Sequence, residues 1–87
     1  MTFKDIYVNV SERYAIGIEV TSGKYYLSIP VSNGMVDYEE YYEITESEFN
    51  DYRENENKTF QVAEKCRNRK VDERLIIKPG SNRGVAV

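Results

Sequence analysis

Between residues 14 and 44 the sequence alternates apolar and polar side chains with a period of two, in three consecutive runs. The apolar positions are Tyr14, Ile16, Ile18 and Val20, then Tyr25, Leu27, Ile29 and Val31, then Val36, Tyr38, Tyr42 and Ile44. Successive side chains of a β-strand point to opposite faces of the sheet. The pattern therefore predicts three half-buried antiparallel strands that share one apolar face.

Short turn signals separate these runs. Ser22-Gly23 joins the first run to the second, and Asn33-Gly34, the strongest short hairpin signal, joins the second to the third. Pro30 cannot donate a hydrogen bond to a neighbouring strand, so we expect it at a bulge or near a strand end. The sequence predicts a three-stranded meander over residues 14–44.

The periodicity changes after residue 44. Thr45 and Glu48 match a capping box, in which each side chain caps the backbone of the other at a helix start. An apolar stripe then continues to Cys66, interrupted at residues 55–57 by poor helix formers. Residues 46–69 are therefore one helix or two, and we favour two, with Asn57 or Thr59 capping the second.

The ends of the chain give weaker signals. Residues 75–77 form a short apolar run before Pro79-Gly80, which predicts a fourth strand. Phe3, Ile6, Tyr7 and Val10 fit a helical face, whereas residues 6–10 have strand composition, and we favour a strand. Residues 81–87 indicate a loop with a short strand at its end. The expected fold is a single α+β domain over residues 1–87, an antiparallel sheet of four to five strands with helix packed on one face. The other face is expected to be polar, rich in tyrosine and open.

Charge is distributed unevenly along the chain. The formal net charge is −3. Residues 37–56 contain nine acidic side chains against Arg53 alone, whereas residues 58–83 contain eight basic side chains against three acidic ones. A dense block of one sign repels itself unless a partner or another part of the chain neutralises it.

The acidic block provides the first candidate binding surface. Its proposed partner-binding residues are Asp37, Glu39, Tyr41, Glu43, Glu46, Glu48 and Asp51. Carboxylates on a sheet can imitate a phosphate backbone and occupy a basic groove, and tyrosine suits protein interfaces. The alternative is a charged outer strand that prevents pairing with other chains. The spaced loop of a calcium site is missing, so no metal site is predicted.

The basic segment provides an alternative. Lys65, Arg67, Arg69 and Lys70 are its candidate nucleic-acid-binding residues. Such binding usually needs exposed aromatic side chains among the basic ones, and the nearest aromatic, Phe60, is expected to lie in the core. Basic residues at a helix end also interact favourably with the helix dipole, and the sequence favours this structural role.

The chain has no histidine and one cysteine, Cys66. The commonest general base and metal ligand is therefore absent, and we expect no enzyme, no metal and no cofactor. One cysteine cannot form an internal disulfide, and Cys66 is expected to be a buried apolar residue. With neither a leader-like start nor an apolar run of membrane-spanning length, the chain is expected to be cytoplasmic.

Four segments resemble a group of short uncharacterised bacterial proteins: residues 28–33, residues 36–44, Cys66-Arg67, and residues 79–84. In general character the chain is similar to immunity proteins of bacterial contact-dependent toxin systems. The resemblance implies a small, acidic, cytoplasmic protein without catalysis that binds and blocks a cognate toxin, often a nuclease. It assigns no functional residue. It agrees with the charge pattern in suggesting a basic protein partner.

Overall fold

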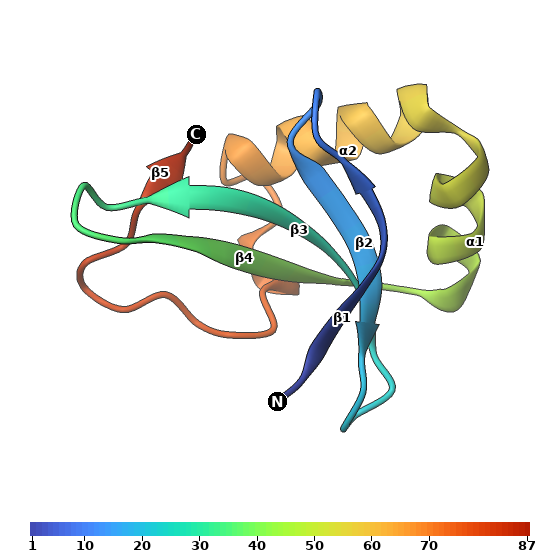
Figure 1. Ribbon diagram of the computed structural model, residues 1–87, viewed down its shortest axis with the longest axis horizontal. Helices are drawn as coiled ribbons and strands as arrows, with labels where there is room; N and C mark the ends of the chain where they lie inside the picture. The colour runs from blue at the N-terminus through green and yellow to red at the C-terminus, as the bar shows by residue number, and fades with distance from the viewer.

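The computed structural model describes residues 1–87 and contains an antiparallel sheet with two helices (Figure 1). Its elements in chain order are β1 (Phe3–Asn9), β2 (Tyr14–Glu19), β3 (Tyr25–Ser32), β4 (Asp37–Ile44), α1 (Glu46–Glu54), α2 (Glu56–Arg67), a short 3₁₀ turn (Asp72–Arg74) and β5 (Val85–Ala86). This confirms the predicted α+β fold with its meander, and the N-terminal strand. Gly23 and Gly34 lie in the two predicted turns with positive φ angles of 74° and 88°.

The strands follow the order β1-β2-β3-β4, and each neighbouring pair is antiparallel. β5 pairs with residues 31 and 32 of β3, beyond the last residue that β2 reaches. Pro30 lies in the interval between these two pairings. Its carbonyl accepts a hydrogen bond from the Val87 amide (3.2 Å), so the missing amide of Pro30 faces the same side, where β2 has already ended. The proline therefore removes no hydrogen bond from the sheet.

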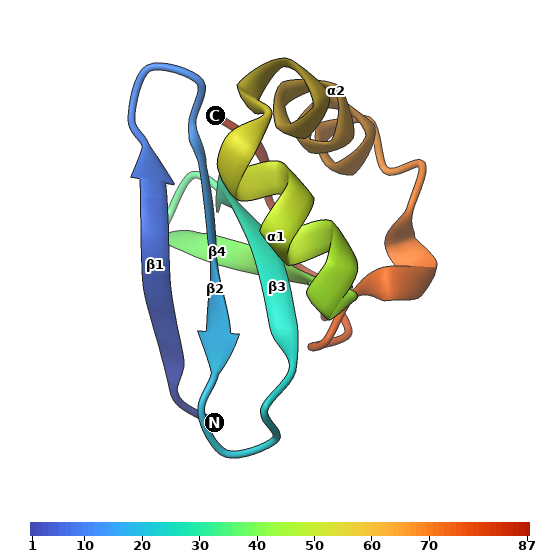
Figure 2. The same ribbon diagram turned by 90° about the vertical axis from the view of Figure 1, so that its right-hand side faces the viewer.

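Both helices pack on one face of the sheet (Figure 2). The core between these layers consists of Tyr14, Ile16, Leu27, Ile29, Val31, Tyr42, Ile44, Phe49, Tyr52, Ala63, Cys66 and Leu75. The predicted apolar face is thus confirmed along all three runs. Val20 and Val36 are exceptions, since each lies just outside a strand and is 57% exposed, and Ile18 is only partly buried and outside the core cluster.

The two helices meet at Asn55, which confirms the two-helix alternative. The Thr45–Glu48 capping box starts α1 as predicted. Asn55 ends α1, and its side chain accepts a hydrogen bond from the Lys58 amide (3.1 Å) to start α2. The cap is therefore Asn55, not Asn57 or Thr59. Thr59 is buried instead and donates to the Tyr52 carbonyl (2.9 Å). Neither helix is long and apolar enough to cross a membrane.

The prediction of a strand over residues 75–77 is wrong. Leu75 forms a single bridge with Tyr42, and the Ile76 amide donates to the Tyr41 carbonyl (2.9 Å). The 3₁₀ turn before this segment and Pro79 after it leave too little extended chain for a ladder. The short strand at the C-terminus is confirmed as β5.

Candidate functional site

The sheet is strongly curved away from the helices. Figure 2 shows β4 passing behind β1 and β2 on the side opposite the helices. Across this hollow the Phe3 ring of β1 stacks on the Tyr41 ring of β4, with centroids 3.6 Å apart. The Tyr26 ring meets both edge-on, at 5.4 Å and 5.0 Å. We call this side the concave face, which carries Phe3, Asp5, Ala15, Gly17, Glu19, Tyr26, Ser28, Pro30, Asp37, Glu39, Tyr41 and Glu43.

This face departs from the open surface expected from the sequence. Tyr26, Ser28 and Glu19 are fully buried, and Tyr41 is half-buried. The cause lies in the start of β1, which covers the part of the concave face that contains Glu19 and Tyr26. A β-bulge at Ile6 separates the pairs that Asp5 and Tyr7 make with β2, so Asp5 points to the concave face while Tyr7 points to the helices.

Glu19 is buried by the N-terminal segment. Its carboxylate accepts hydrogen bonds from the backbone amides of Thr2 (2.8 Å), Thr21 (3.0 Å) and Ser22 (2.8 Å). The Ser22 hydroxyl and these amides hold the pKa of Glu19 at about 2, although burial opposes the shift. Alternation alone had placed this residue at an exposed position.

A pH-dependent loss of stability is expected from Glu19. A carboxyl whose pKa is lowered on folding stabilises the protein above its unfolded pKa, and this stabilisation is lost as pH falls toward its folded pKa. Thermal melts of the wild type should therefore show a melting temperature that declines between about pH 4.5 and pH 2. Glu19→Gln should melt lower at pH 7 and show a flatter profile in this interval. An equally steep profile in the variant would assign the acid loss to other carboxyls.

A groove of about 500 Å³ opens on the concave face next to the β1–β2 turn, between β1 and β4. Its walls and floor include Asp5, Val8, Arg13, Ala15, Pro30 and Glu39. Asp5 and Glu39 come from the first and the fourth strand of the sheet. Only the curvature brings these two carboxylates to the same recess.

The two carboxylates of the groove differ in how they are held: a hydrogen bond fixes Asp5, whereas Glu39 takes part in no ion pair. The Tyr26 hydroxyl donates to Asp5 Oδ1 (2.6 Å), which fixes this carboxylate and contributes, after burial, to a raised pKa of Tyr26. Burial raises the pKa of Glu39, and Asp5 adds to the effect while the Ser28 hydroxyl counters it in part. Ser28 Oγ itself is buried and has no hydrogen-bond partner of good geometry. Such an unsatisfied buried hydroxyl is uncommon in a folded protein.

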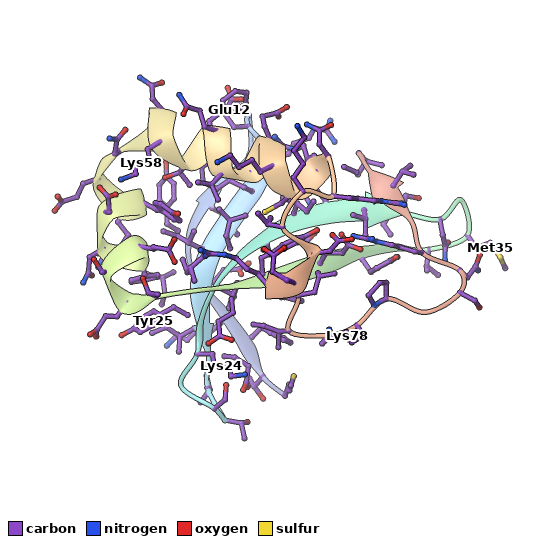
Figure 3. All side chains as sticks on the ribbon, turned by 180° about the vertical axis from the view of Figure 1, so that it is seen from behind. Glu12, Lys24, Tyr25, Met35, Lys58 and Lys78 are labelled. Atoms are coloured by element: carbon purple, nitrogen blue, oxygen red, sulfur yellow. The ribbon has the colours of Figure 1, made fainter.

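Exposed apolar side chains border the concave face. Val8, near the end of β1, and Val10, in the β1–β2 turn, line the groove, and Val10 is 83% exposed. Met35, 85% exposed, lies at the tip of the β3–β4 hairpin, far from the helices (Figure 3). Acidic groups flanked by exposed apolar ones are a composition that suits a protein interface better than a small-molecule pocket.

The acidic candidates from the sequence fall into two sets. Asp37, Glu39, Tyr41 and Glu43 lie together on the concave face, along β4. Glu46, Glu48 and Asp51 lie on α1, which packs on the opposite face of the sheet. The structure does not bring the seven residues together as one surface. Asp5, which joins the first set, lacked any local signal in the sequence.

The carboxylates of α1 are occupied within the protein. Glu48 completes the capping box and forms an ion pair with Arg74 (2.9 Å). Asp51 forms an ion pair with Lys58, and Glu46 accepts a hydrogen bond from the Tyr25 hydroxyl (2.9 Å). These contacts favour a structural role for the α1 set.

The basic candidates are also largely occupied. Arg67 donates to the carbonyls of Glu12 and Arg13, and so ties α2 to the β1–β2 turn. Arg69 donates to the Gly84 carbonyl (3.0 Å). Lys65 and Lys70 are exposed. Residues 65–83 contain no aromatic side chain, and Phe60 on α2, which was expected in the core, is 37% exposed and lies outside the core cluster.

Cys66 is buried at the centre of the core, and burial raises the pKa of its thiol to about 12. The structure contains no cluster of three or more histidine, cysteine or carboxylate side chains able to hold a metal ion.

No protein-family model matches this chain, and comparisons with curated proteins and with solved structures find no similar protein.

Proposed function

We propose that this chain is a cytoplasmic, non-catalytic protein-binding module, an immunity-type inhibitor that neutralises a bacterial toxin domain. The concave face is its binding surface, and the toxin, for example a nuclease, presents a basic surface to it. The observation that carries the proposal is the set of carboxylates on this face. Asp5, Asp37 and Glu39 take part in no ion pair, and Glu43 is paired only loosely with Lys24 (3.6 Å).

Unpaired carboxylates on one face repel each other in the free protein. The raised pKa of Glu39 has this origin in part, since Asp5 disfavours its charged form. A positively charged partner relieves the repulsion and is steered toward the face during encounter. The α1 carboxylates supply little of this attraction, because the protein's own cations already neutralise two of them.

The form of the face also favours protein over substrate. The hollow is lined by aromatic rings and bordered by exposed Val8, Val10 and Met35, which can cover apolar surface on a partner. A basic nuclease groove, built to hold phosphates, is a suitable counterpart for carboxylates spaced along a strand.

Reversing the charge of Glu39 tests the proposal. The partner to be used is a toxin domain encoded by a gene that adjoins the gene for this chain, and association is followed by stopped flow at low and high salt. Glu39→Lys should slow association at least tenfold at low salt, because steering by charge contributes factors of about 10 to 10³ to on-rates. High salt should reduce the difference.

Glu54→Lys is the matched control. Glu54 is exposed at the end of α1, and the variant makes the same change in net charge away from the concave face. Its association rate should stay within about twofold of wild type. Equal slowing by both variants would show that only net charge matters, and an unaffected Glu39→Lys would remove the concave face as the binding surface. A toxin that shows no binding to the wild type would overturn the function itself.

A further inference from the structure

We infer that the groove between β1 and β4 is the recess for one arginine side chain of the protein partner, with the guanidinium held between Asp5 and Glu39 above Ser28. The assignment of this arginine to a toxin rests on the proposed function. The preference of the groove for a guanidinium group rests on the groove alone.

Asp5 is held ready to accept. Its Oδ1 is fixed by the Tyr26 hydroxyl (2.6 Å), and its second oxygen makes no hydrogen bond within the protein. The Tyr26 ring is itself fixed by edge-on contacts with Phe3 and Tyr41. A carboxylate that is already oriented loses little entropy when a ligand binds.

Glu39 supplies the second acceptor, with Ser28 beneath it. Glu39 is close enough to Ser28 for the hydroxyl to influence its pKa, yet the Ser28 oxygen has no partner. Ser28 lies beneath the groove lining on the concave face, between Ala15 and Tyr41 of the neighbouring strands. Its buried hydroxyl can donate to Glu39 and so orient that carboxylate toward a cation bound in the groove.

The arrangement fits arginine better than a metal ion. Two carboxylates are too few for a metal site, and no third ligating side chain joins them. The planar guanidinium carries five N–H donors in a fixed fork and can reach acceptors on two sides at once. An ammonium group concentrates its charge at one point and keeps its water more strongly.

The apolar walls of the groove suit the methylene groups of an arginine side chain. Val8, Ala15 and Pro30 form apolar surface beside the carboxylates, where the methylene groups of an arginine can lie. Arg13 also borders the groove, but the two carboxylates outnumber it, so the lining stays negative. The volume of about 500 Å³ lies within the usual range for small-ligand sites.

Nuclear magnetic resonance of the ¹⁵N-labelled full chain tests this inference without any toxin. The probes are N-acetyl-arginine methylamide, its lysine analogue, and the neutral citrulline analogue, each titrated at low salt. The arginine probe should shift the amides of Asp5, Ser28 and Glu39 to saturation, with a dissociation constant on the order of millimolar. The lysine probe should bind at least fivefold more weakly, and citrulline should leave these amides unchanged.

Three variants complete the test. Glu39→Gln and Asp5→Asn should each weaken arginine binding at least tenfold, and a wild-type-like spectrum confirms that each is folded. Glu54→Gln removes an exposed carboxylate from the end of α1, away from the groove, and should change binding less than twofold.

The inference would be overturned if the amide shifts were spread equally over all acidic residues. Equal binding of the lysine probe, or undiminished arginine binding by Glu39→Gln, would overturn it as well. If arginine fails to bind while Glu39→Lys still slows toxin association, the recess is rejected and the proposed function stands. If arginine binds in the groove while the toxin does not associate, the recess stands and the proposed function is rejected.

Discussion

Gly17→Ala is expected to destabilise the protein by about 3 kcal/mol, at the upper end of the usual cost of overpacking. A Cβ atom at Gly17 would lie far inside contact distance of the Lys4 carbonyl oxygen and 2.5 Å from the Tyr26 hydroxyl. One neighbour is the backbone of β1 and the other is a ring enclosed by aromatic contacts, so neither can move freely. Separation of β1 from β2 would relieve the clash with the backbone, so we expect the concave face to open and Asp5 to leave the groove.

Urea unfolding followed by circular dichroism measures this effect, because the midpoint falls in proportion to the lost stability. A loss of this size is a large fraction of the total stability of a domain of this length. Gly80→Ala is the control, since nothing lies within 4 Å of a Cβ at that position. It should change the midpoint little. A Gly17→Ala variant as stable as Gly80→Ala would show that β1 is held less tightly than its packing indicates.

The elements that the sequence predicted well are those encoded by local signals. Period-two alternation, the glycines of the two turns and the Thr45–Glu48 capping box each act within a few residues of chain. Their structural meaning depends little on what packs against them. The meander, its apolar face and the start of α1 could therefore be derived without tertiary information.

The concave face could not be derived in this way. Whether Glu19 and Tyr26 are exposed depends on the curvature of the sheet and on the bulge at Ile6, which shifts the register of β1. Asp5 reaches the groove only because of that shift. Sequence alternation shows which residues share a face, but it does not show that a strand two positions away folds across them.

The C-terminal segment shows a related limit. Leu75, Ile76 and Ile77 form a short apolar run, which suits a strand and a covering segment equally well. In the structure the run lies along the edge of β4, and a loop continues past Lys78 beside that strand (Figure 3). Side-chain contacts of Arg83 hold the end of this segment, and such long-range ion pairs have no periodic signal.

Arg83→Met is expected to destabilise the protein by about 3 kcal/mol at pH 7, the low end of the range for breaking a buried ion pair. The guanidinium donates to both oxygens of Glu40 (2.7 and 3.1 Å) and to both oxygens of Asp72 (2.8 and 3.0 Å). Glu40 is only 7% exposed, whereas the Asp72 side chain is 40% exposed. Most of the loss should therefore come from Glu40, because its buried charge would keep only the Tyr42 hydroxyl (2.8 Å) as a partner.

A double-mutant cycle separates this effect from simple loss of packing. In Arg83→Met with Glu40→Leu, no buried charge is left unpaired, so the double variant should recover at least half of the stability lost by Arg83→Met. The readout is the urea midpoint of the wild type, both single variants and the double variant. If the two losses simply add, the ion pair contributes no coupling, and the C-terminal segment is held instead by β5 and by the Gly84 amide, which donates to the Tyr38 hydroxyl (2.7 Å). Recovery in the double variant would mean that neutralising Glu40 is the main task of Arg83, and that this basic residue is no more available to an outside partner than Arg67 is.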